Sequence, residues 1–323
     1  MKNNMVKFIT TLLMIFMVIS CSEDEENLSY PKVDRHDKLP ADIIKRTPET
    51  DFHPPILDSD EFEQPVPLGP AINTSGVEDS PFVTPDGNTM YFFFTPDVRV
   101  PVNEQLLDEV TGVWVSHRSE DGEWSEAERL WLQYPGKLAL DGAVCVQDDE
   151  MWFASAREGY TGVNMFTAEL TDGKWRNWKY CGDRLMNELQ IGEVHITGND
   201  LYFHSDREDG AGDYDLWQTT RDGSVWSDAE NISELNTTGM DGFPFVSSNG
   251  DELWFMRNHL GTPAIYRSKR ETGGWSMPEV IVRQFAGEPT RDDAGNLYFV
   301  HPFYENDVMI EADIYVAYSK ERK

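Results

Sequence analysis

Five stretches of the same kind recur along this 323-residue chain, and they constrain its fold more than any other feature. Each has an acidic residue, a short apolar strand, a tight polar turn and then an aromatic pair. The five are "VEDSPFVTPDGNTMYFFF", "LDGAVCVQDDEMWFAS", "IGEVHITGNDLYFHSD", "MDGFPFVSSNGDELWFM" and "AGEPTRDDAGNLYFVHP". Units that return every ~50 residues with this strand pattern are typical of arrays in which each unit is one small sheet. The sequence therefore predicts an all-β fold.

The ends of the array predict how it closes. Each unit continues with a third strand, and the first four add a turn marked by Trp124, Trp175, Trp226 or Trp275 and a fourth strand. The fifth unit stops after its third strand, whereas "PVPLGPAINTSGVEDSPFV" before the first unit matches "DAENISELNTTGMDGFPFV" before the fourth. Residues 64–73 are therefore expected to complete the last unit. This predicts a five-bladed β-propeller over residues 51–323, with its ring closed by an N-terminal strand.

The N-terminus is predicted to lie outside this fold. Lys2 and Lys7 precede the apolar run "FITTLLMIFMVIS", which is short for a membrane span, and "VISC" resembles the lipobox of bacterial lipoproteins. Residues 1–20 are thus expected to be a signal peptide, followed by an acylated Cys21 and a flexible acidic tether over residues 21–50. The acidic run after Cys21 resembles the surface-export signal of Bacteroidota lipoproteins. It implies an outer-membrane anchor at the cell surface, with the periplasmic face as the alternative.

The charge of the chain limits its partners. The formal net charge of −31 makes nucleic acids and anionic membrane surfaces poor partners, so membrane contact is expected through the lipid anchor alone. We expect a monomer. Besides Cys21 only Cys145 and Cys181 remain. They are either a disulfide or, since Cys145 lies in an apolar strand, free thiols.

The repeat resembles the TolB-like, WD-type propeller repeat of secreted bacterial proteins. "SPFVTPDGNTMYF" and "HSDREDGAGDYDLW" are the best matches, and the resemblance covers residues 64–320. The second and third units depart from it, with "QDDE" and "GND" where the pattern has Pro-Asp-Gly. The resemblance implies the fold but not an activity, because such propellers include scaffolds, binding modules and enzymes.

The opening acids are predicted to gather at one end of the propeller, which we call the mouth. The loops after the aromatic pairs return to this same end. Relative to Pro81, Val144, Val194, Pro244 and Pro289, the acids stand three residues or one residue earlier, and both offsets are odd. All should therefore point to one side of their strands. These acids are Glu78, Asp141, Glu193, Asp241 and Glu288, and Asp79, next to Glu78, is the alternative opening acid of the first unit. Because an acid recurs in every unit, a purely structural ring is the alternative.

Side chains that break the repeat suggest elimination on an acidic sugar. Imidazole transfers protons near neutral pH and arginine neutralises a carboxylate, so a uronic-acid oligosaccharide would be the substrate of a lyase or dehydratase in polysaccharide degradation. Propeller lyases that act on acidic polysaccharides are similar in this respect. The base would be His195 or His204, the acid Tyr304 or Tyr160, and the clamp Arg207 or Arg157, with Glu193 beside them. The other residues expected to bind substrate are Arg257, His301, Asp79, Asp141, Asp241 and Glu288; Arg99 and His259 lie in the same loops.

Three other hypotheses stay open. The order Asp79, Asp141, Glu193 is similar to the base, modulator and acid of five-bladed arabinanase-like glycoside hydrolases. A non-catalytic glycan-binding or envelope scaffold propeller is a hypothesis of another class. The loop "SDREDGAGDYD", with Asp213 and Asp215, either ties itself together or holds a calcium or other divalent ion. Elimination requires His195, His204 and an arginine within reach of one substrate atom.

Overall fold

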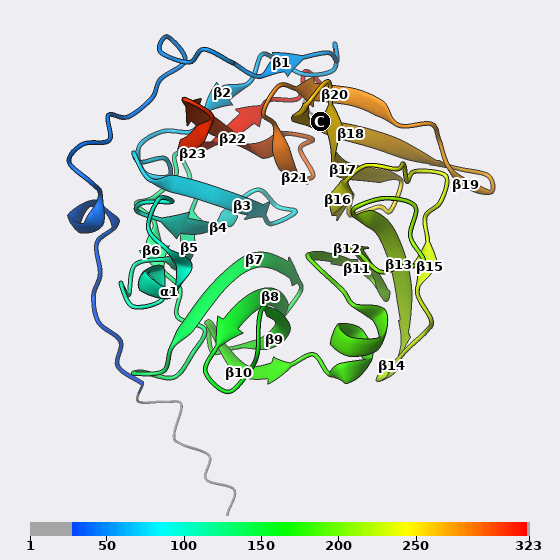
Figure 1. Cartoon of the computed structure of the whole chain (residues 1–323), viewed down its shortest axis with the longest axis horizontal. Coiled ribbons are helices and arrows are strands. Elements are labelled where there is room, and N and C mark those ends of the chain that lie inside the picture. Colours follow the sequence, from blue (N-terminus) through cyan, green and yellow to red (C-terminus); the bar gives the residue numbers. More distant parts are fainter. Residues whose placement is uncertain (1–27, 322–323) are drawn as a thin grey trace, which may run out of the picture.

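The protein is an all-β molecule whose antiparallel sheets are consistent with a β-propeller. The structure is a computed structural model that describes residues 28–321, so the predicted signal peptide and Cys21 lie outside the described residues. Figure 1 shows small sheets arranged around a common centre. The helical elements within residues 28–321 are short: η2 (Arg35–Lys38), α1 (Val102–Gln105) and η3 (Arg184–Leu189). No helix in this part of the chain is long and apolar enough to cross a membrane.

The strands of residues 28–321 form four hydrogen-bonded sheets, which we divide into five groups according to the five sequence units. The first and fifth groups share one eight-stranded sheet. The first two groups are β3 (Val77–Val83), β4 (Thr89–Thr95), β5 (Gly112–His117) and β6 (Glu128–Arg129), then β7 (Ala139–Gln147), β8 (Glu150–Arg157), β9 (Asn164–Thr171) and β10 (Lys174–Tyr180). The third group is β11 (Val194–Thr197), β12 (Asp200–Ser205), β13 (Asp215–Asp222), β14 (Val225–Trp226) and β15 (Glu230–Asn231). The fourth is β16 (Asp241–Val246), β17 (Glu252–His259), β18 (Thr262–Glu271), β19 (Gly274–Trp275) and β20 (Glu279–Arg283). The fifth is β21 (Gly287–Arg291), β22 (Leu297–Glu305) and β23 (Val308–Ala317).

Two strands from the N-terminal part of the chain complete the last two groups. β1 (Ile56–Leu57) pairs antiparallel with β20, and β2 (Val66–Pro67) pairs antiparallel with β23. The expected pairing of residues 64–73 with the last unit is thus present. The first strands contact one another in the order β3, β7, β11, β16 and β21, and β21 in turn contacts β3.

The aromatic pairs of the repeat connect neighbouring groups. The Tyr91 hydroxyl of the first group accepts a hydrogen bond from Trp175 Nε1 of the second, at 3.2 Å. In the same way Arg270 of the fourth group donates to Tyr202 of the third. Tyrosine suits this place because its ring is buried in the sheet packing while its hydroxyl still finds a partner. The recurring aromatic residues therefore hold the groups together and do not mark an active site.

A β-bulge recurs in four of the five first strands and sets the direction of the site residues. The register shifts between Gly142 and Cys145, and at the equivalent points of β3, β16 and β21. The residue in each bulge has a positive φ although it is not glycine: Ser80 45°, Ala143 46°, Phe243 55° and Glu288 51°. A bulge places one extra residue opposite a single partner, so it reverses the alternation of side chains along the strand.

Residues 28–50, expected to belong to a flexible tether, instead contact the sheets. Arg35 is 2% exposed and donates to the carbonyl oxygens of Ala71 at 2.8 Å and Ile72 at 2.6 Å. Its guanidinium lies 5.4–5.5 Å from the ring centroids of Phe92, Phe94 and Trp114. A buried cation bonded in this way anchors the segment against the first group. The tether prediction for residues 21–27 lies outside the described residues.

The same segment reaches the fifth group further along. Lys45 forms ion pairs with the buried acids Glu311, at 2.5 Å, and Asp313. Asp51 accepts a hydrogen bond from His301 Nε2 at 3.0 Å. In Figure 1 this segment, drawn in blue, runs around the outside of the sheets. We call residues 28–55 the strap.

Candidate functional site

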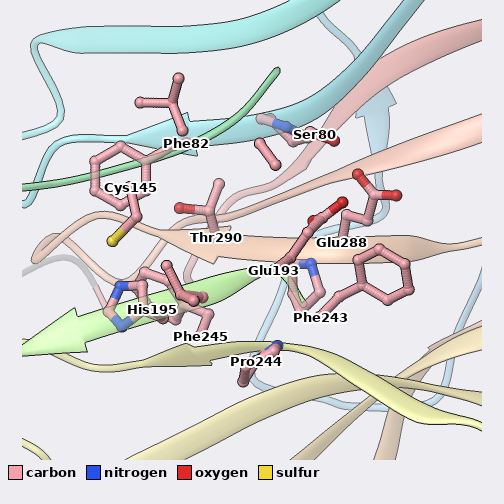
Figure 2. A pocket seen from close by; sticks show the side chains of 15 residues that line it. Ser80, Phe82, Cys145, Glu193, His195, Phe243, Pro244, Phe245, Glu288 and Thr290 are labelled. Atoms are coloured by element: carbon pink, nitrogen blue, oxygen red, sulfur yellow. The ribbon is translucent and has the colours of Figure 1, made fainter. Parts of the chain in front are cut away.

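One small cavity is lined by residues of all five first strands and by Glu193, which directly precedes β11. Its volume is about 50 Å³. Two levels of side chains surround it. The upper level, nearer the mouth, consists of Ser80, Ala143, Glu193, Phe243 and Glu288, and the lower level of Phe82, Cys145, His195, Phe245 and Thr290. Figure 2 shows Glu193 and Glu288 close together at one end, with His195 and Cys145 further along.

Three of the six predicted acids do not face this cavity. Asp141 is fully buried within its own group, where it accepts from Arg157 Nη2 at 2.7 Å and from Ser155 Oγ at 2.6 Å. Asp241 is bonded likewise to Arg257 Nε, at 2.5 Å. Glu78 accepts from the Thr74 hydroxyl at 2.7 Å and lies 3.5 Å from Arg35 Nη1. Each has a guanidinium partner, so these three are scaffold acids.

The prediction that all the acids share one side is therefore wrong, and the bulge is the reason. The scaffold acids stand three residues before the alignment point, on the far side of the bulge, whereas Glu193 and Glu288 stand one residue before it. The extra residue in the bulge reverses the alternation of side chains. A residue three positions before the alignment point therefore lies on the opposite side of the strand from a residue one position before it. Asp79 also belongs with the cavity acids, because its carboxyl is hydrogen-bonded to that of Glu288. We call Asp79, Glu193 and Glu288 the acid trio.

Burial raises the pKa values of all three members of the acid trio. Burial, and then the charge of Asp79, raise the pKa of Glu193 to about 8. Burial, followed by the charges of Asp79 and Glu193, holds the pKa of Glu288 well above its ordinary value. Burial raises the pKa of Asp79 too, although hydrogen bonds from Glu288 and the Ser80 N–H oppose the rise. Glu193 is therefore protonated at neutral pH.

Among residues 28–321, no guanidinium or ammonium group is bonded to the acid trio. All three side chains are partly exposed, and Glu193 and Glu288 line the cavity. Glu288 Oε2 has no hydrogen-bond partner among the described residues. Buried acids without a cation destabilise a fold, and such arrangements cluster at functional sites.

The sequence also marks Asp79 as a departure from a recurring glycine, a signal that the sequence analysis did not use. Two residues before the alignment point, four units have glycine: Gly142, Gly192, Gly242 and Gly287. The first unit has Asp79 at this position. A Cβ on Gly142 would approach Phe93 at 3.1 Å, and one on Gly242 would approach His204 Nδ1 at 3.3 Å. Glycine thus accommodates a side chain from the preceding group, and the aspartate is a departure from a structural rule.

His204, a predicted base, is such a packing residue. Its ring lies 4.8 Å from Phe243 and 4.9 Å from Tyr214, between centroids. Its nitrogens face the backbone N–H groups of Phe243 and Glu193, at 3.2 and 3.5 Å. Burial lowers the pKa of His204 to about 4. It occupies the place of Phe93 and so belongs to the contact between groups.

The other two predicted histidines lie in different surroundings. His195 lines the lower level of the cavity, where its Nδ1 accepts from the Val246 N–H at 3.2 Å. Burial lowers the pKa of His195 to about 3, so the ring is neutral. His301 is fully buried, with Nδ1 2.8 Å from the Phe285 carbonyl oxygen and Nε2 on Asp51. The three histidines therefore do not converge.

The predicted clamps and acids are also separate. Arg157 and Arg257 are bound to the scaffold acids. Arg207 pairs with Asp209 at 2.6 Å, and its guanidinium lies 4.4 Å from the centroid of the Trp217 ring. Arg99 pairs with Asp97 and Asp42. His259 Nδ1 lies 2.7 Å from the Tyr266 hydroxyl. Tyr160 packs on Phe166 and Tyr180. Only Tyr304 comes near the trio: burial and then the charge of Asp79 raise its pKa.

The cysteines are free thiols, and the acidic loop is bonded to itself. Cys145 and Cys181 are both free, and burial raises the pKa of each thiol to about 12. Asp215 accepts from the Ala211 N–H at 2.6 Å and the Gly212 N–H at 3.0 Å, so the loop ties itself together. Within residues 28–321, no group of three or more His, Cys, Asp or Glu side chains is arranged to hold a metal ion. The calcium alternative for this loop stays a prediction.

Comparison with known proteins bears on the fold. No family model matches the sequence, and no curated protein does. Among solved structures, a protein of unknown function from Dyadobacter fermentans has a TM-score of 0.50 and 11% identity, covering 83% of this chain and 100% of that one. TolB from Acinetobacter baumannii has a TM-score of 0.43 and 12% identity, with 78% of this chain and 57% of that one covered. An α-L-arabinofuranosidase catalytic domain from Coprinopsis cinerea scores 0.46 at 10% identity, with 83% and 99% covered.

These similarities define a class of fold and nothing narrower. The neighbours include TolB-like β-propeller proteins at low identity. Identities this low show the fold alone. The chain spans 57% of the length of the Acinetobacter TolB chain.

Proposed function

We propose that this protein is a carbohydrate-active, five-bladed β-propeller that cleaves glycosidic bonds of a neutral glycan at the mouth of its central cavity. The observation that carries the proposal is the contrast between two kinds of acid. Asp141 and Asp241 are neutralised by arginines of their own groups, whereas the acid trio has no cation partner and is partly exposed. The structural acids of this fold are neutralised by arginines. Three acids without a cation partner therefore indicate a functional site.

The five-bladed ring is part of this proposal. It is supported by the five strand groups, by the contacts that run from β3 round to β21 and back to β3, and by the pairing of β2 with β23. A ring closed in this way brings the first strand of every blade to one axis, so side chains from distant units can share one substrate.

The proposed chemistry gives the acids different roles. Glycoside hydrolysis uses one carboxylic acid that protonates the leaving oxygen and one carboxylate that activates water or attacks the sugar. Glu193, with a pKa of about 8, holds a proton at neutral pH and is the proposed proton donor. Asp79 is the proposed carboxylate, and the hydrogen bond from Glu288 orients it. In the inverting form Asp79 takes a proton from the attacking water while Glu193 gives its own to the leaving group.

This assignment differs from elimination on a uronate. Elimination needs a cation to neutralise the substrate carboxylate, and the predicted clamps are bound to Asp141, Asp209 and Asp241. The net charge of −31 further disfavours an anionic substrate. Elimination and non-catalytic glycan binding are both outcomes that the experiment below distinguishes.

The proposed location is the outer membrane, with a lipid on Cys21 and the propeller at the cell surface. The lipobox-like sequence and the acidic run that follows it support this. Replacing Cys21→Ala should release the protein from the membrane fraction, and protease treatment of intact cells should degrade the wild type. A Cys21→Ala protein that stays in the membrane fraction contradicts the anchor.

The activity is tested on purified residues 22–323. The substrates are linear arabinan, galactan, mannan and β-glucan, with polygalacturonate as the acidic counterpart. New reducing ends from a neutral polymer, lost in Glu193→Gln and Asp79→Asn but kept in the exposed control Glu271→Gln, support hydrolysis. Absorbance of an unsaturated uronate from polygalacturonate indicates elimination instead. The proposal is wrong if no neutral polymer is cleaved, or if Glu193→Gln remains as active as the wild type.

A further inference from the structure

One amino group of the strap lies between two buried carboxyl groups of the fifth group. Lys45 Nζ is 2.5 Å from Glu311 Oε1 and also contacts Asp313 Oδ1. The Glu311 side chain is fully buried and that of Asp313 is 2% exposed, whereas Lys45 is 35% exposed. Both acids lie on β23 two positions apart, so they point to the same side of the strand. We call Lys45, Glu311 and Asp313 the lysine cluster.

The lysine cluster differs from the other lysine contacts of the described chain. Both of its acids lie in the interior, and the Phe303 ring centroid is 5.9 Å from Lys45 Nζ. In the other lysine ion pairs within residues 28–321 both partners are exposed: Lys137 with Glu158, Lys179 with Glu169, and Lys269 with Glu61. An exposed pair contributes little to stability, whereas buried charges are costly unless they are fully compensated. The lysine cluster has two buried carboxyl groups for one ammonium group.

Burial makes one carboxyl of the lysine cluster a neutral acid. Burial raises the pKa of Asp313 to about 8, although the charge of Lys45 opposes this rise. It also raises the pKa of Glu311, against the effects of Lys45 and of the Arg46 N–H. Burial lowers the pKa of Lys45, but the charges of Asp313 and Glu311 outweigh burial, so this pKa is raised. At pH 7 the cluster therefore holds an ammonium group beside a protonated Asp313 carboxyl.

These groups are the reactants of an amide condensation. An amine in contact with a carboxyl oxygen has the carboxyl carbon about 3–3.5 Å away, which is the distance of a near-attack arrangement. Glu311 accepts a proton from the Lys45 ammonium, and the free Nζ bonds to Asp313 Cγ. The C–OH bond of Asp313 then breaks, and the hydroxyl leaves as water with a second proton from Nζ. Glu311 relays that proton and ends protonated, so the charges balance without an oxidant or a co-reactant.

We propose that Lys45 Nζ and Asp313 Cγ are joined by an intramolecular amide bond that Glu311 helps to form. The product is neutral, so it removes the charges of Lys45 and Glu311 from an interior in which charge is costly. The neutral amine is a minor form of Lys45, but groups that the fold holds together react from a small population. This modification goes beyond the proposed hydrolysis and does not depend on it.

The amide bond fixes the strap to a strand that connects the two ends of the array. β23 pairs antiparallel with β2 and parallel with β3, and it carries both acids of the lysine cluster. The strap is the described segment that follows the proposed lipid anchor at Cys21. A force on the anchor therefore reaches β23 through a covalent bond, even when the non-covalent contacts of Arg35 are broken.

Mass spectrometry of purified, denatured residues 22–323 tests the bond directly. The wild type is expected to be one water molecule lighter than its sequence, and digestion with trypsin should give a branched peptide that joins Lys45 to Asp313. Lys45→Arg keeps the positive charge but loses the amine, so it should have the unmodified mass. Lys137→Arg is the matched control, because Lys137 pairs with an acid at the surface, and it should keep the bond. Glu311→Gln should slow bond formation about a hundredfold or more, so newly purified protein should have mostly the unmodified mass.

The measurement on the wild type decides the proposal even where a variant fails to fold. A wild-type mass equal to that of the sequence overturns the bond. A water loss without a peptide branched at Lys45 and Asp313, or a water loss that persists in Lys45→Arg, overturns it as well. If the bond forms as fast in Glu311→Gln as in the wild type, Glu311 does not transfer the protons and that part of the proposal is wrong.

Discussion

Replacing Glu193 by glutamine should stabilise the protein at neutral pH. The pKa of Glu193 is raised from 4.5 to about 8 by burial and by Asp79. The folded state therefore holds a proton that the unfolded state releases above pH 4.5, so folding stability falls as the pH rises from 4.5 to about 8. Glutamine has nearly the same shape and does not titrate, so the variant escapes this loss.

The expected size follows from the same pKa shift. At pH 7 the gap from 4.5 is about 2.5 pKa units, and at about 1.4 kcal/mol per unit this gives about 3 kcal/mol. Glu193 is partly exposed and interacts with Asp79, so we expect about 1–3 kcal/mol. For a domain of this size that raises the melting temperature by roughly 2–4 °C per kcal/mol. Near pH 4 the gain should vanish, because Glu193 is then protonated in both states.

Scanning calorimetry at one heating rate checks this, at about pH 4 and about pH 8. Asp141→Asn is the matched control, because its carboxylate is fully buried but bonded to Arg157 and Ser155. Removing one partner of such a pair should destabilise the protein by about 3–5 kcal/mol. The two substitutions remove chemically similar groups and should shift the melting temperature in opposite directions. A Glu193→Gln protein that melts at or below the wild-type temperature near pH 8 would refute the view that the acid trio is unpaired and costly.

Three further results are expected. Hydrolysis should fall as the pH rises through about 8, because Glu193 then loses the proton that it donates; a pH profile of kcat/KM that is flat across that range contradicts its role. Asp79→Gly, which restores the glycine of the other four units, should fold with unchanged or higher melting temperature and lose activity; loss of folding would show that Asp79 is structural. Arg35→Ala should lower stability by about 2–4 kcal/mol, since it leaves the buried Glu78 without its cation and removes the Arg35 donor from two carbonyl groups. Urea titration measures this, and an unchanged midpoint would mean that the strap does not stabilise the sheets.

The sequence predicted the fold well where the repeat itself carries the information. The alternation of apolar residues defines each strand, and the match of two distant segments located the strand Val66–Pro67 against the last group. Both signals depend on main-chain pairing and burial, which every unit needs in the same form.

The candidate site was harder to predict, for two physical reasons. Acids that stand three residues and one residue before the alignment point share a side only if the strand is regular, and the bulge at Ala143 and its equivalents breaks that condition. A histidine such as His204 looks like a departure from the repeat, yet its ring packs against Gly242 as Phe93 packs against Gly142. The burial of Arg35 could not be predicted, because one buried cation in a polar segment leaves no periodic pattern.

The glycine position explains why Asp79 meets Glu288 where the first and fifth groups are in contact. At three of these contacts a side chain from the preceding group fills the space above a glycine: Phe93 above Gly142, His204 above Gly242 and Met256 beside Gly287. The second group has the short Ala154 at this position, and there His204 of the third group itself approaches Gly192. The fifth group has the short Val300. A short side chain on one partner leaves room for a longer one on the other, and the first group has Asp79 there. Substituting both members of this one contact admits a carboxylate beside Glu288 without changing the strand pairing of any group.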